Sequence, residues 1–96
     1  MKILPLTLYR KWFDEIAIGK KTEEYRAITP YWEKRFLDNG EPIIFDEIHF
    51  KNGYNRGLPW MRVEWKGLII KPIEATPIYV IQLGRVLEIK NWPGPA

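Results

Sequence analysis

The segment Gly19–Arg26, GKKTEEYR, carries the densest group of chemically active side chains in this chain. It contains two ammonium groups, two carboxylates, a hydroxyl, a phenol and a guanidinium. If the segment is extended, Thr22, Glu24 and Arg26 share one face, and a carboxylate and a guanidinium stand about 7 Å apart. Such a guanidinium can donate a bidentate fork to a phosphate, while the acid accepts from an amino or hydroxyl group. The pattern indicates a polar ligand, although a solvated edge strand with alternating charges has the same spacing.

Each charged residue of this segment has a structural alternative beside its chemical role. Lys21 is a ligand contact, a catalytic base, or the salt-bridge partner of Glu24 or Glu23. Arg26 is a clamp for a phosphate or the partner of Glu24, and one arginine can do both. In a binding site, Lys21, Glu24 and Arg26 would line the cleft. In an enzyme, Lys21 and Glu24 would be the catalytic pair.

The chain is rich in aromatic residues, with five Trp, five Tyr and four Phe among 96 residues. Most of them must pack in the core of so small a domain, but exposed rings can stack on the bases of single-stranded nucleic acid. The candidates for stacking are Tyr25, Tyr31, Trp32 and Tyr54. Trp32 and Phe36 have the spacing of helical packing. Tyr54 follows Asn52 and Gly53 in a predicted loop and is the better ligand contact, whereas Asn52 either contacts the ligand or only shapes the turn.

Outside these segments, few polar residues have a spacing that indicates chemistry. Arg62 lies on the wet face of a predicted strand, so it is either an exposed charge or a further ligand contact. His49, the only histidine, shares a strand face with Glu47, which allows acid–base chemistry but falls short of a metal site. Arg10 and Lys11 begin a helix and face either solvent or a phosphate. The sequence predicts no metal site and no cofactor.

Hydrophobic periodicity predicts the elements that position these residues. The predicted strands are Lys2–Leu8, Lys21–Arg26, Pro42–Phe50, Trp60–Ile70 and Ile78–Ile89. The predicted helices run from Tyr9 to Ala17, before the stop signal Gly19, and from the Thr29-Pro30 cap to Asn39-Gly40. The pattern also predicts a turn at Lys51–Tyr54, bends at Gly67 and Gly84, and a loose tail at Asn91–Ala96. Together they predict a single α+β domain, residues 1–96, built as a bent barrel of about five to six strands with two short helices.

Composition argues against several classes of protein. Without cysteine the chain has neither disulfides nor a thiolate nucleophile, which suits a reducing cytoplasm. No stretch approaches the roughly 18 apolar residues of a membrane span, and the N-terminal sequence is a poor signal peptide. The net charge of +3 is mild and evenly spread, which permits an anionic ligand without indicating a non-specific DNA binder. We therefore expect a cytoplasmic protein without a membrane partner, with a monomer favoured.

The segment Gly19–Arg26 also fits a known signature. It resembles the pattern G-x-K-x-x-E-x-R of the ASCH domain family, with Gly19, Lys21, Glu24 and Arg26 at the signature positions. The order of predicted elements along nearly the whole chain resembles that family as well. Later segments resemble its small stand-alone bacterial and phage members: PYW at 30–32, FKNGY at 50–54 and MRVE at 61–64.

The resemblance implies a fold similar to the PUA domain of RNA-modifying enzymes, and RNA, a nucleotide or a modified nucleoside as ligand. It implies a cleft lined by Lys21, Glu24 and Arg26, and it adds weight to Arg62 as a contact. One branch of the family resembles amidohydrolases that remove the acetyl group from N-acetylcytidine and carry a Thr at the position of Glu24. The carboxylate at Glu24 argues against that reaction in this chain.

RNA or nucleotide binding, with Tyr54 stacked on the ligand, is therefore the leading hypothesis. The first alternative is a small hydrolase or ribonuclease that acts on RNA or modified nucleosides through Lys21 and Glu24. The second alternative is a protein-interaction module, with an exposed edge strand and a Trp60–Trp65 hairpin as its surface.

Overall fold

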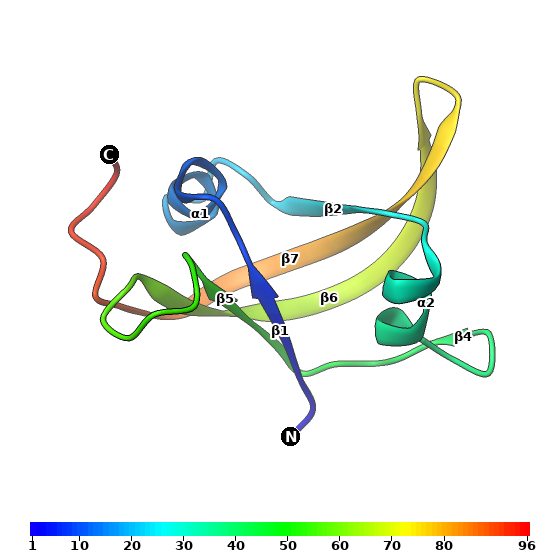
Figure 1. Ribbon diagram of the computed structural model, residues 1–96, viewed down its shortest axis with the longest axis horizontal. Coiled ribbons are helices and arrows are strands. Elements are labelled where there is room, and N and C mark those ends of the chain that lie inside the picture. The colour runs from blue at the N-terminus through cyan, green and yellow to red at the C-terminus, as the bar shows by residue number, and fades with distance from the viewer.

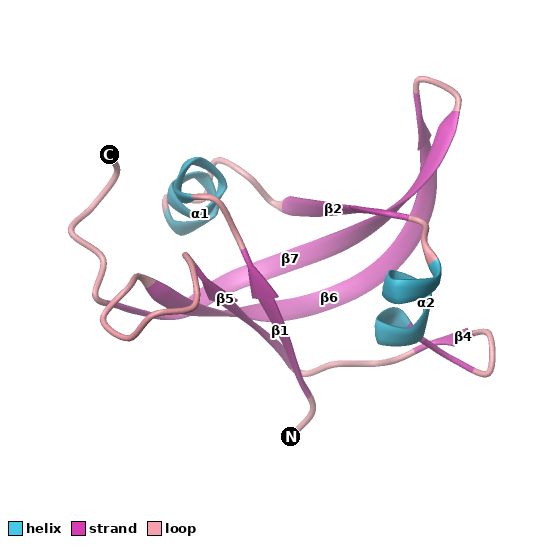
Figure 2. Cartoon of the chain, in the orientation of Figure 1, coloured by secondary structure: helices cyan, strands magenta, loops and turns pink.

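A computed structural model describes all residues of the chain, 1–96. The elements follow in the order β1 (Ile3–Thr7), α1 (Arg10–Ala17), β2 (Glu23–Ala27), α2 (Pro30–Phe36), β3 (Leu37–Asp38), β4 (Glu41–Pro42), β5 (Glu47–Lys51), β6 (Trp60–Ile73) and β7 (Thr76–Lys90). Five strands form one curled sheet, with α1 and α2 on opposite sides of the view in Figure 1 and strands distinguished from helices in Figure 2. The predicted α+β class, with a bent sheet and two short helices, is confirmed.

The sheet order β1-β5-β6-β7-β2 leaves β1 and β2 as its two edges. β1 runs parallel to β5, and every other neighbouring pair in this sheet is antiparallel. Arg26 of β2 donates a hydrogen bond from Nη2 to the Thr7 carbonyl of β1 at 3.3 Å. Because β1 and β2 share no ladder, a side chain joins the two edges where backbone pairing does not. The sheet is therefore a half-barrel whose opening lies between β1 and β2.

Alternation along the strands sends one face of each into a single core. The buried side chains are Leu4 and Leu6 from β1, Phe13 and Ile16 from α1, Phe36 from α2, Ile48 and Phe50 from β5, Met61 and Val63 from β6, and Tyr79 and Ile81 from β7. Burial of one such side chain contributes about 1.5–3 kcal/mol. Phe36 packs edge-on against Tyr79 with ring centroids 5.3 Å apart. The core thus attaches both helices to the sheet and holds them beside its opening.

The two glycines predicted as bends, Gly67 and Gly84, lie on β6 and β7. Gly67 has a φ of 141° and coincides with a shift in the β6–β7 register, which confirms the predicted bend. Gly84 serves a different purpose, because a Cβ there would lie 2.8 Å from the Cβ of Glu64. Atoms do not pack at that distance, so only glycine allows this close approach of the two strands.

Helix α2 begins as the sequence predicts. The Thr29 side chain accepts a hydrogen bond from the backbone N–H of Trp32 at 3.3 Å, and Pro30 occupies the first turn. Neither helix of the structure is long and apolar enough to cross a membrane.

The predicted end of this helix at Asn39-Gly40 is wrong. The helix stops at Phe36, because the short strands β3 and β4 pair with each other directly after it. Asn39 and Gly40 have φ values of 52° and 80° and form the turn between these strands. Asn-Gly is a strong hairpin signal as well as a helix stop, and here it forms the turn of a hairpin.

Two strand predictions also need correction. Pro42–Phe50 is not one strand, because Pro42 belongs to β4 and β5 begins only at Glu47. β6 and β7 extend further than predicted, because Glu74 and Ala75 adopt φ values of 48° and 69° and connect them as one hairpin. Trp60–Trp65 is consequently part of β6 and not a hairpin.

The C-terminal segment 91–96 has no regular secondary structure, yet it is fastened to α1 rather than loose. Asp14 accepts hydrogen bonds from the Trp92 indole N–H at 2.8 Å and from the Ala96 backbone N–H at 3.0 Å. Arg10 binds the same carboxylate through Nε at 2.7 Å and also donates to a backbone carbonyl of the segment. The Ala96 N–H, helped by Arg10 and Trp92, lowers the pKa of Asp14 to about 2.

Replacing Asp14 by Asn should make the stability of the fold less dependent on pH. The ionised carboxylate stabilises the fold above its usual pKa of 3.8, and this contribution is lost as the pH falls toward about 2. In urea unfolding at about pH 5, Asp14→Asn should have a lower midpoint than the wild type, and the two should converge near pH 2. Asp38→Asn, at an exposed aspartate, is the matched control. A constant difference between wild type and Asp14→Asn across this range would contradict the role of the carboxylate.

Candidate ligand cleft

A cleft of about 640 Å³ opens between the two edges of the half-barrel. Its lining comes from three parts of the chain: Thr7–Arg10 with Trp12, Glu24–Arg26, and Asn52–Tyr54. The first part leads from β1 into α1, the second belongs to β2, and the third is the loop after β5. The volume lies within the range of small-molecule sites, about 300–1,000 Å³. Part of the segment Gly19–Arg26 therefore forms one wall of a cleft.

Several contacts hold Arg26 in this wall, but not all of its N–H donors have hydrogen-bond partners. Nη2 donates to the Thr7 carbonyl at 3.3 Å and to Oε2 of Glu24 at 3.2 Å, and the guanidinium carbon lies 4.9 Å from the centre of the Trp32 ring. The side chain is 19% exposed, and its Nε is buried without a hydrogen-bond partner. An unsatisfied buried donor costs about 1–3 kcal/mol, and more when it is charged. An acceptor atom of a ligand would therefore be stabilised here.

Glu24 is engaged by its neighbours and has no free oxygen. Its side chain is 7% exposed, with Oε1 accepting the backbone N–H of Tyr25 at 2.9 Å and Oε2 accepting Arg26. That N–H lies on an edge strand, where a donor outside the ladder needs another partner. Glu24 is thus a structural residue that pairs the free edge of β2 and neutralises Arg26.

The loop after β5 presents Tyr54 to the cleft. Asn52 fixes this loop, because Nδ2 donates to the Leu8 carbonyl at 3.0 Å and the backbone N–H donates to the Pro59 carbonyl at 2.9 Å. Tyr54 is 89% exposed. An aromatic ring on an anchored loop contributes little to the core and is well placed to stack on a ligand. Asn52 therefore mainly shapes the loop, which is one of the two roles predicted for it.

Lys21 lies beside the cleft rather than in it. Its Nζ is 4.5 Å from the centre of the Tyr25 ring and 5.0 Å from that of Trp12, which are cation–π distances. Both rings also line the cleft, and Lys21 lines an adjoining hollow of about 260 Å³. Lys21 and Glu24 form no ion pair, and they line different hollows.

The Tyr25 ring is held from its other end by Glu23. This carboxylate accepts the Tyr25 hydroxyl at 2.9 Å and the Gln82 amide at 3.0 Å, and Lys71 Nζ lies 3.4 Å away. The hydrogen bond from Tyr25 is the largest cause that lowers the pKa of Glu23, and the same bond raises the pKa of the Tyr25 hydroxyl. The ring therefore has a fixed orientation at the rim of the cleft.

Tyr9 and Trp12 line the cleft, although they were not among the residues predicted to contact a ligand. Tyr9 is 82% exposed because it precedes the first turn of α1 as its N-cap residue and so does not share the buried face of the helix. Lys11 and Lys21 place their ammonium groups over the Trp12 ring. The sequence predicts a helix that includes Tyr9, so the actual start at Arg10 is what places its ring at the cleft.

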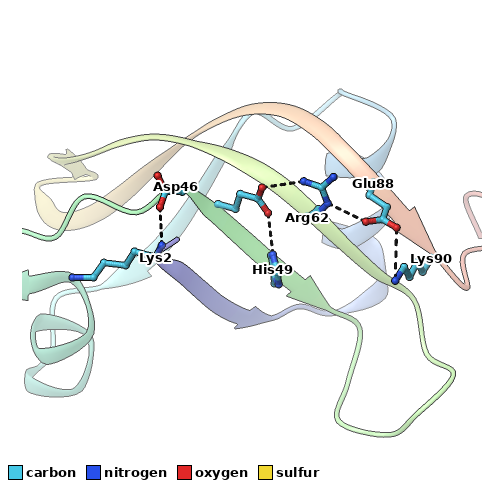
Figure 3. Close-up of polar contacts among 7 residues, drawn as sticks. Lys2, Asp46, His49, Arg62, Glu88 and Lys90 are labelled. Atoms are coloured by element: carbon cyan, nitrogen blue, oxygen red, sulfur yellow. Dashed lines mark hydrogen bonds and ion pairs between the residues drawn. The ribbon is translucent and has the colours of Figure 1, made fainter.

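Arg62 and His49 lie outside the cleft. The neighbours of Arg62 along β6 are buried in the core, so Arg62 projects from the outer face of the sheet. It donates to Glu47 from Nη1 and to Glu88 from Nε, both at 2.9 Å, and His49 Nε2 lies 3.1 Å from Glu47 (Figure 3). The bond with Glu88 raises the pKa of Arg62 and lowers the pKa of Glu88. The structure thus places Arg62 in an ion-pair network and not at the cleft as a ligand contact.

No family model, no curated protein and no solved structure matches this chain. The resemblance of Gly19–Arg26 to the ASCH signature therefore remains a prediction. No group of three or more potential metal-ligating side chains occurs in the structure. The chemistry of the cleft itself has to indicate the function.

Removing one member of the Glu24–Arg26 pair should lower the free energy of unfolding more than removing both members. Glu24→Ala leaves the largely buried guanidinium unpaired, and loss of one member of a buried pair costs on the order of 3 kcal/mol. Adding Arg26→Met to Glu24→Ala removes the unpaired charge. The double variant should therefore lose less stability than the sum of the losses in the two single variants. Urea unfolding of the two single variants and the double variant measures this. Strictly additive losses would show that the two side chains do not stabilise each other.

Proposed function

We propose that this chain binds single-stranded RNA, or nucleotides and modified nucleosides derived from RNA, in the cleft beside β2. The observation that carries the proposal is an arginine with a buried, unpartnered Nε in the wall of a cleft rimmed by exposed aromatic rings. Guanidinium groups are suited to phosphate oxygens, and aromatic rings are suited to the faces of bases. A nucleotide offers both chemistries in one ligand.

Each of the three chain segments that line the cleft contributes at least one aromatic ring. These rings are Tyr9, Trp12, Tyr25 and Tyr54, and all four are exposed. Stacking on such rings is worth about 1–3 kcal/mol per base and tolerates different bases, because every base has an aromatic face. The fixed orientation of Tyr25 and the anchored loop of Tyr54 lower the entropy that a ligand must remove.

The charge around the cleft favours an anion. Arg10 and Arg26 line it, and the carboxylate of Glu24, which also lines it, is already paired with Arg26. The ammonium groups of Lys11 and Lys21 lie nearby over the Trp12 ring. A positive surface attracts phosphates, raises association rates and makes binding weaker at high salt.

The architecture agrees with the same proposal. The resemblance to ASCH and PUA domains implies a bent sheet with a ligand cleft beside the signature strand. The curled sheet carries Glu24 and Arg26 along one edge, in the cleft wall. We therefore extend the proposal to a PUA-like domain of the ASCH type.

Binding is favoured over catalysis at this site. Both oxygens of Glu24 accept hydrogen bonds, one from the Tyr25 N–H and one from Arg26, and these bonds stabilise the carboxylate in a structural role. Lys21 packs against aromatic rings beside the cleft and does not share its lining. A residue that must accept or donate a proton needs direct reach to the ligand.

A short single-stranded RNA of mixed sequence should bind at the cleft. NMR mapping of backbone amides should show shifts at Thr7–Arg10, Glu24–Arg26 and Asn52–Tyr54, because these segments line it. Affinity should fall as salt is raised, since phosphate contacts release counterions. Shifts confined to the outer face around Arg62, or no binding at millimolar nucleotide, would refute the proposal.

Two variants should weaken this binding without unfolding the chain. Tyr54→Ala removes an exposed ring and should lower the affinity for RNA roughly tenfold, the loss expected for one stacked base. Arg26→Lys keeps the charge beside Glu24 but removes Nε and the planar fork, so it should also weaken binding. Arg85→Ala, at an exposed arginine that does not line the cleft, is the control and should bind as the wild type does. Circular dichroism checks that each variant is folded.

A further inference from the structure

A second hollow adjoins the cleft on the other side of Arg26. It has a volume of about 370 Å³ and lies between β1 and α2. Thr7, Arg26 and Tyr54 line both hollows, so these three residues form their common boundary. The volume is again within the range of small-molecule sites, about 300–1,000 Å³. Two spaces of ligand size therefore meet at one arginine.

The second hollow is more positive than the first. Arg35 and Lys51 line it together with Arg26, and no carboxylate does. Neither Arg35 nor Lys51 takes part in a salt bridge of the structure, although Arg35 donates at 3.4 Å to the Pro5 carbonyl. Tyr31, which is 59% exposed, supplies an aromatic wall with the Arg35 guanidinium 5.7 Å from its ring centre. The second hollow thus repeats the combination of cation and exposed ring that characterises the cleft.

We propose that the cleft and the second hollow are subsites for two consecutive nucleotides, with Arg26 at the phosphate that connects them. The inference rests on the proposed function and specifies its ligand: the unit of recognition is a dinucleotide step of a single strand, not a lone nucleotide. One base occupies the cleft among Tyr9, Trp12 and Tyr25, and the next base lies against Tyr31.

The side chains at the boundary are suited to this role. Tyr54 projects into solvent between the hollows, and both faces of its ring are open to a base because the ring is 89% exposed. Arg26 uses only Nη2 for its bonds to Thr7 and Glu24, which leaves Nη1 and the buried Nε without partners. A phosphate accepts two parallel N–H groups from a guanidinium, so a small rotation of this group would satisfy the unpaired donor.

Adenosine 5′-monophosphate and the dinucleotide pApA distinguish one subsite from two. If both hollows bind, pApA should bind roughly tenfold tighter than the mononucleotide, because a second base stacks and a second phosphate is contacted. A dinucleotide whose second nucleotide lacks its base should have an affinity between those of the mononucleotide and pApA. Isothermal titration calorimetry at constant salt measures all three affinities.

A pair of substitutions in the second hollow should reduce only the gain from the second nucleotide. Arg35→Ala with Lys51→Ala should remove the charge contribution to pApA binding, so that pApA loses part of its advantage while mononucleotide binding stays unchanged, which also shows that the cleft is intact. Lys34→Ala with Lys66→Ala removes the same charge from positions that line neither hollow and should leave both affinities as in the wild type.

The outcomes separate this inference from the function on which it rests. Equal affinity for pApA and the mononucleotide, or a pApA advantage that is undiminished by Arg35→Ala with Lys51→Ala, would overturn the two-subsite arrangement while RNA binding stands. Failure of the mononucleotide, pApA and longer RNA to bind at all would overturn both.

Discussion

The closure of the half-barrel depends on one arginine. The curled sheet ends in two edge strands that share no backbone ladder, and Arg26 bridges them through the Thr7 carbonyl. Its charge is tolerated because Glu24 lies 3.2 Å away and the Trp32 ring lies beneath the guanidinium. The same bridge separates the cleft from the second hollow. The guanidinium that links the two edges is therefore also the one assigned to the ligand in the proposed function, and a sheet with fully paired edges would leave no opening there.

Free strand edges are a hazard, because unpaired N–H and C=O groups invite pairing with other chains. Here side chains occupy part of both edges. On β1, Pro5 has no N–H to offer, and the Pro5 and Thr7 carbonyls accept Arg35 and Arg26. On β2, Glu24 takes the N–H of Tyr25. These contacts make strand addition by a protein partner a less favoured use of the opening, and they place arginine side chains along its margins, where an anionic ligand can reach them.

Local patterns in the sequence predicted the elements that carry the site better than they predicted the tertiary contacts between those elements. The predicted strand Lys21–Arg26 is present from Glu23 onward, and the exposed loop at Tyr54 is present as well; both follow from short-range signals. Tyr9 was missed because helical spacing says which residues share a face but not where the first turn begins. The outward position of Arg62 fits strand alternation, whereas its ion pairs depend on register with β5 and β7, which one sequence does not reveal. The loss of Lys21 from the cleft is likewise a tertiary effect, since two aromatic rings attract its ammonium group.

The two hollows differ in the carboxylates around their cations. In the cleft, Arg10 is bound by Asp14 at 2.7 Å and Arg26 by Glu24 at 3.2 Å, so both cations are held in place but partly neutralised. Such pairs reduce the side-chain entropy lost on binding and also reduce the attraction for a phosphate. In the second hollow, Arg35 and Lys51 have no carboxylate in the lining and keep their full charge. In the proposed function, the cleft would therefore select by stacking and geometry, and the second hollow would add affinity through charge. Binding in the cleft should accordingly depend less on ionic strength than binding across both hollows.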